Sequence, residues 1–131
     1  MFGVKQVTER LEGLGYEVKK QDEQALAYCV KKTRSTIKNK IHGTDIPVGL
    51  EHVAADMAVG EFLKAKKTFA PEDIAGLDLS CAIKQIQEGD TNIVFSTGEG
   101  SLTAEQRLDW LINYLMTYGL DELVHYRRLV W

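Results

Sequence analysis

The chain is short, evenly composed and close to neutral. Its 131 residues are 44% hydrophobic, 27% charged and 8% aromatic, which is typical of one soluble globular domain and excludes collagen-like, disordered and disulfide-dense classes. Its 16 basic and 19 acidic side chains give a formal charge of -3, so the whole chain lacks the basic excess of a dedicated nucleic-acid-binding protein. We therefore expect a single domain over residues 1–131.

The beginning of the chain carries charges before any apolar stretch long enough for a signal peptide. No apolar run approaches the about 18 residues that a membrane-spanning helix needs. We expect a cytoplasmic protein with no membrane partner. The two cysteines, Cys29 and Cys81, lie among apolar helical positions and are interpreted as buried thiols rather than a disulfide or a nucleophile.

Apolar residues recur at helical spacing through the first half of the chain. This pattern predicts helices over residues 4–14, 22–41 and 48–67, with Asp22 as the cap of the second. The third helix carries Glu61 within the arc of its apolar stripe, and a carboxylate there needs a partner. That partner is an Arg or Tyr of the same domain or a neighbouring subunit.

The spacing of apolar residues changes in the second half of the chain. After a predicted helix over residues 77–88, the sequence TNIVF at 91–95 predicts a strand inside an arm over 89–101. Thr103 and Gln106 form a capping box that opens a long helix, which Gly119 ends. A short helix over 121–126 and an extended tail over 126–131 complete a mainly α fold: a small bundle of about four to five helices with one short strand or hairpin arm and an extended C-terminal tail.

Residues 24–44 contain five basic side chains and no acidic one. Three of them, Lys31, Arg34 and Lys38, lie within about 60° of one another on a helical wheel and form what we call the basic ridge. The ridge is a candidate for contact with DNA phosphates or an acidic partner, and the alternative is a solvated helix face. No aromatic residue is interleaved with it, so base stacking has no support.

Residue spacing gives little support to an enzyme. His52 and Asp56 have the i, i+4 spacing of metal ligands but no third member, so a surface pair is the better interpretation. The glycine pairs at 13–15 and 98–100 lack the phosphate-binding fingerprint. A Cys29–His52 pair, or the carboxylates of Asp56 and Glu61, are conceivable catalytic sets that no spacing favours. We expect no catalytic residue, no metal and no cofactor.

Aromatic residues gather in the last quarter of the chain. Trp110 and Tyr114 share a second side of the long helix, with Tyr118 near its edge. The tail mixes large rings with arginine, as the centres of protein interfaces do. The predicted interface residues are Ile93, Val94, Phe95, Trp110, Tyr114, Tyr126, Arg127, Arg128 and Trp131. The tail either packs on its own domain, pairing with the strand, or binds another chain.

Several short motifs from about residue 47 onward match one known group of proteins. They are DMAVGEFL at 56–63, KQIQEGDTNIVF at 84–95, TAEQR at 103–107, LINYL at 111–115 and YRRLVW at 126–131. With these motifs the chain resembles the small head-tail connector proteins of tailed phages and prophages of Gram-positive bacteria.

The resemblance implies a helical adaptor without catalytic activity or cofactor. Such a protein forms a ring with copies of itself beneath the portal protein and joins the DNA-filled head to a downstream connector or tail protein. It would lie at the virion neck, and in the host cytoplasm during assembly, with the basic ridge a candidate for non-specific contact with packaged DNA. The alternative hypotheses are a small helical DNA-binding regulator that uses the basic helix around residues 31–40, and a small enzyme that uses Cys29 and His52.

Overall fold

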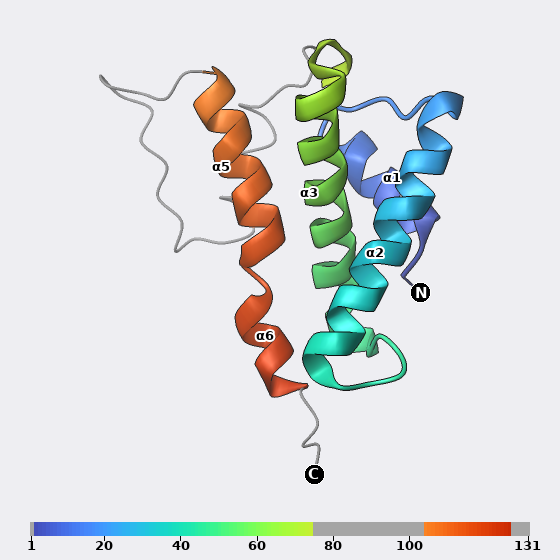
Figure 1. Ribbon diagram of the computed structural model, residues 1–131, viewed down its shortest axis with the longest axis vertical. Coiled ribbons are helices and arrows are strands. Elements are labelled where there is room, and N and C mark those ends of the chain that lie inside the picture. Colours follow the sequence, from blue (N-terminus) through green and yellow to red (C-terminus); the bar gives the residue numbers. More distant parts are fainter. Residues whose placement is uncertain (1, 75–103, 127–131) are drawn as a thin grey trace.

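The helices pack around one central helix, α3 (Figure 1). The computed structural model describes residues 2–74 and 104–126, of which 81% are helical. The α-helices are α1 (Val4–Gly13), α2 (Glu23–Ile41), α3 (Glu51–Phe69), α5 (Ala104–Thr117) and α6 (Leu120–His125). Short 3-10 turns occupy Lys20–Asp22, Val48–Leu50 and Pro71–Ile74. The described residues contain no strand, and the mainly α class of the fold is confirmed.

The predicted helix boundaries agree with these bounds to within about three residues. The largest difference is at the third helix, where residues 48–50 form a 3-10 turn before α3 begins at Glu51. The predicted helix over 77–88, the strand, the arm over 89–101, Thr103 and the tail beyond Tyr126 lie outside the described residues. So do Cys81 and six of the proposed interface residues: Ile93, Val94, Phe95, Arg127, Arg128 and Trp131.

α3 is buried on almost every side. α1 and α2 pack on one side of it and α5 on the other (Figure 1). A helix with neighbours on several sides needs apolar or small residues all round, and α3 has them continuously from Val53 to Gly60 apart from Asp56. At Gly60 a Cβ atom would lie 2.5 Å from Cγ of Met116, so α5 packs against the backbone of α3 at that point.

The corner between α5 and α6 also depends on a glycine. A Cβ atom on Gly119 would lie 2.8 Å from Cγ2 and 3.1 Å from Cβ of Val53, at the start of α3. The helix break predicted at Gly119 is therefore present. At this corner the chain passes close to the first turn of α3.

Asp22 connects the α1–α2 link to α3. The structure starts α2 directly after Asp22, as predicted, but the carboxylate makes no cap to the helix. Instead Asp22, 1% exposed, accepts hydrogen bonds from the hydroxyl of Tyr16 (2.7 Å) and the amide of Lys19 (3.1 Å), and pairs with the ammonium of Lys66 (2.8 Å). The capping role was wrong because a buried partner on α3 competes for the same oxygens.

The pKa of Asp22 is lowered from its ordinary value of 3.8. Burial of the carboxylate opposes ionisation, but the bonds from Lys66, Tyr16 and the Lys19 amide outweigh that cost. Asp22 is thus an ionised side chain in the interior whose charge is matched by donors from the α1–α2 link and from α3.

Candidate interaction surface

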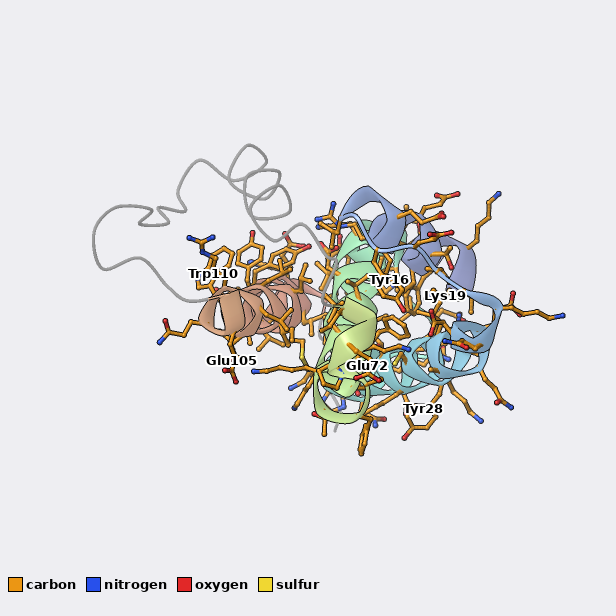
Figure 2. The ribbon with its side chains drawn as sticks, turned by 90° about the horizontal axis from the view of Figure 1, so that it is seen from above. Tyr16, Lys19, Tyr28, Glu72, Glu105 and Trp110 are labelled. Atoms are coloured by element: carbon orange, nitrogen blue, oxygen red, sulfur yellow. The ribbon has the colours of Figure 1, made fainter. Side chains whose placement is uncertain are left out.

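Three aromatic rings stack along one side of α5, and we call them the aromatic ladder. Trp110 and Tyr114 lie with ring centres 5.4 Å apart and planes inclined by 10°, and Tyr114 and Tyr118 follow at 4.9 Å and 13°. The side chains are half-buried, so each ring packs partly on the core and partly reaches the surface. Trp110 extends from the side of α5 on which α1 lies, and Glu105 extends from the opposite side (Figure 2).

The lower end of the ladder is held by a buried carboxylate. The hydroxyl of Tyr118 donates to Oδ2 of Asp56 (2.5 Å), and Nε of Arg10 donates to Oδ1 of the same carboxylate (2.8 Å). These contacts join α1, α3 and the end of α5. Burial raises the pKa of Tyr118, and the carboxylate of Asp56 raises it further, so the hydroxyl remains a donor at neutral pH.

The predicted surface pair between His52 and Asp56 is wrong. Asp56 is only 8% exposed and turned to Arg10 and Tyr118, whereas Nε2 of exposed His52 lies 3.3 Å from the Glu122 carboxylate on α6. Spacing along one helix could not show this, because the partners come from other helices. The available signal was a carboxylate inside an apolar stretch of α3, which indicates a buried group in need of donors.

An open depression of 690 Å³ lies next to Arg10 and Asp56, between α1 and the start of α3. We call it the acidic depression because its charged lining is mainly carboxylate. Its polar lining residues are Gln6, Glu9, Arg10, Glu51, His52 and Asp56. Val48 and Ala55 supply an apolar part, and Val48 is 82% exposed. Within the described chain, the buried Oε1 of Gln6 has no hydrogen-bond partner.

The basic ridge is only partly available for a partner. Arg34 donates to the carbonyl of Phe2 (3.1 Å), and its guanidinium lies 5.5 Å from the centre of the Phe2 ring, so this side chain holds the N-terminal segment. Lys31 is exposed and Lys38 is half-exposed on the same helix. The structure therefore brings the three together on α2 but gives Arg34 a structural contact.

Glu61 finds its partner within the chain. Its carboxylate accepts a hydrogen bond from Nζ of Lys32 on α2 at 3.1 Å, so the partner is a lysine rather than the expected Arg or Tyr. This bond raises the pKa of Lys32. One member of the basic run is thus used to join α2 to α3.

Cys29 is a buried free thiol, as predicted. Burial raises its pKa, and the nearby charge of Glu61 adds to the effect, so the thiol stays protonated at neutral pH. His52 is paired with Glu122 on another part of the molecule.

Tyr126, the last described residue, packs on the turn before α3. A Cβ atom on Gly49 would lie 3.0 Å from Cζ of Tyr126, so the phenol ring covers this glycine in the turn before α3. The ring remains 41% exposed. The end of the Tyr126 side chain therefore lies next to the sequence neighbour of Val48, which lines the acidic depression.

Among the residues that the structure describes, no group of three or more His, Cys, Asp or Glu side chains could hold a metal ion. None of the helices in residues 2–74 and 104–126 is long and apolar enough to cross a membrane.

Comparison with protein-family models, curated proteins and solved structures found no match. The resemblance to head-tail connectors therefore rests on the sequence motifs and stays a prediction.

Proposed function

We propose that this protein is a structural adaptor of a phage or prophage virion, which forms a ring beneath the portal protein and joins the head to the tail or the next connector. The observation that carries the proposal is the aromatic ladder. It offers half-buried rings of Trp110, Tyr114 and Tyr118 on one side of α5, fixed at one end by Asp56. Rigid aromatic surface of this kind forms the centre of protein interfaces, since few side-chain torsions are lost on binding.

Other features support the same function. α3 connects α1, α2 and α5, which gives a firm body able to carry an interface on more than one side. The sequence RRLVW at 127–131 follows the exposed Tyr126 and supplies two arginines and a further aromatic side chain. A ring subunit needs surfaces for two lateral neighbours and for a component above or below it.

The proposal is tested by co-sedimentation with the assembled portal protein encoded by the same genome. The full chain is expected to sediment with the portal ring, and a chain ending at Tyr126 is expected to remain in the supernatant. Ending at Tyr126 keeps the ring that covers Gly49, so the described fold is preserved. Failure of the full chain to sediment with the portal would overturn the proposal, and equal sedimentation of both chains would exclude the tail as its anchor.

A second arm addresses the aromatic ladder. Trp110→Ala is expected to weaken portal binding or ring formation about 30-fold, the effect of losing about 2 kcal/mol at an interface centre. The matched control is Tyr28→Ala, which removes a ring that is 66% exposed on α2. Thermal unfolding followed by circular dichroism shows whether each variant is folded. Equal binding by the two variants would exclude the ladder as the interface.

The DNA-binding regulator remains a weaker alternative, because Arg34 of the basic ridge already binds Phe2. It predicts salt-dependent binding to duplex DNA that is lost in Lys31→Ala/Lys38→Ala. Binding of that kind without portal binding would replace the adaptor proposal.

A further inference from the structure

The acidic depression has the composition of a site for a basic side chain. Glu9 is an exposed carboxylate in its lining, while Arg10 is offset by the carboxylate of Asp56. The Oε1 atom of Gln6 is a buried acceptor without a donor among the described residues. A guanidinium carries five N–H donors, and its aliphatic stem can cover an apolar side chain such as the exposed Val48.

Two consecutive arginines, Arg127 and Arg128, follow Tyr126 in the sequence. The ring of Tyr126 covers Gly49, the sequence neighbour of Val48. One turn earlier on α6, Glu122 is paired with His52 of the depression. An extended residue spans about 3.3–3.6 Å, so Arg127 and Arg128 follow Tyr126 within about 7 Å along the chain, and their long side chains extend further.

We infer that the acidic depression is the docking site of the chain's own Arg127–Arg128 pair, which thereby sets the direction in which Leu129, Val130 and Trp131 leave the body. The neighbouring depression of 780 Å³ shares Val48 and Glu51 but is lined by Arg34 and Lys38, which repel a second guanidinium. The attachment at Tyr126 gives the tail of the same chain a high effective concentration at the site, higher than that of a second copy in dilute solution.

The test uses the isolated full chain. In a Trp110→Phe background Trp131 is the only tryptophan, so its fluorescence anisotropy and quenching by acrylamide report the tail. At low salt, Glu9→Arg is expected to raise the quenching constant of Trp131 at least two-fold and to lower its anisotropy. Arg128→Glu should do the same, and the double variant Glu9→Arg/Arg128→Glu should restore the values of the background.

The matched control is Asp45→Arg, a reversal of one charge in the neighbouring depression, which should leave Trp131 unchanged. Glu9 is exposed on α1, so its reversal leaves the core intact. The indole N–H resonance of Trp131 in the chain with Trp110 present gives the same information without altering the ladder.

Two outcomes would overturn the inference. Equal quenching in all variants means that the arginine pair is not docked. Docking that disappears on dilution means that a second copy provides the tail. Neither outcome affects the adaptor proposal, which depends on portal sedimentation rather than on the state of the isolated chain.

Discussion

At the scale of single residues, the two buried carboxylates contribute to stability in a different way from the ion pairs at the surface. Asp22 and Asp56 each accept hydrogen bonds from donors on other segments, so each one fixes several parts of the chain together. The His52–Glu122 pair is half-exposed on both sides and is screened by water. Removing a buried acceptor leaves donors unpaired, whereas removing a surface partner leaves a group that water solvates.

Asp56→Ala is therefore expected to lower the free energy of unfolding by about 2–3 kcal/mol, since Arg10 and Tyr118 both lose their acceptor. Tyr118→Phe removes only one of the two bonds and should cost about 1 kcal/mol. Urea denaturation measures both. The control is His52→Ala, with an effect below about 0.5 kcal/mol. Equal effects for Asp56→Ala and His52→Ala would contradict the stabilising role of the buried Asp56 contacts.

At the scale of elements, α5 and α6 attach to the first three helices mainly along α3. α5 packs directly on α3, and α6 makes a smaller contact with α2. Close approach at Gly60 and Gly119 replaces side-chain packing at two points. The position of the aromatic ladder on the surface is consequently set by how closely these two glycines let the helices come together.

Gly119→Ala is expected to destabilise the protein by about 1–3 kcal/mol, because the new Cβ atom meets the β-branched side chain of Val53, which has little freedom to move away. Chemical denaturation gives the value. Gly13→Ala is the control: a Cβ there meets nothing within 4 Å, and alanine favours the helix. Val53→Ala in the Gly119→Ala background should recover part of the loss, and no recovery would argue against the clash.

At the scale of the whole molecule, the interior ion cluster at Asp22 makes stability depend on pH. The carboxylate holds the α1–α2 link to Lys66 near the end of α3. Its pKa is lower in the folded chain than the ordinary 3.8, so its contribution to stability is present above that value and is lost as the pH falls through the lowered pKa. Protonation in acid weakens a contact between distant parts of the sequence.

The difference in unfolding free energy between the natural chain and Asp22→Asn is therefore expected to be constant above about pH 5 and to shrink below about pH 4. Urea titrations from pH 2 to pH 7 measure this difference and cancel most of the effect of the other carboxylates. A difference that stays the same down to pH 2 would show that the charge of Asp22 does not contribute.

The sequence was sufficient for the helices of residues 2–74 and 104–126 and for their buried sides. Helical spacing of apolar residues, glycine at helix ends and the Trp110–Tyr114 side of α5 are local patterns, fixed by 3.6 residues per turn. The thiol of Cys29 was also assigned correctly from its apolar neighbours.

Only the tertiary structure decided which charges pair. Asp56 takes Arg10 and Tyr118, Glu61 takes Lys32, and Asp22 takes Lys66, all from distant parts of the chain. Periodicity along one helix shows which side a carboxylate occupies but not which donor meets it, because that depends on how the helices pack. For the same reason the composition of the chain could exclude classes of protein, while the acidic depression appears only when α1 and the start of α3 come together.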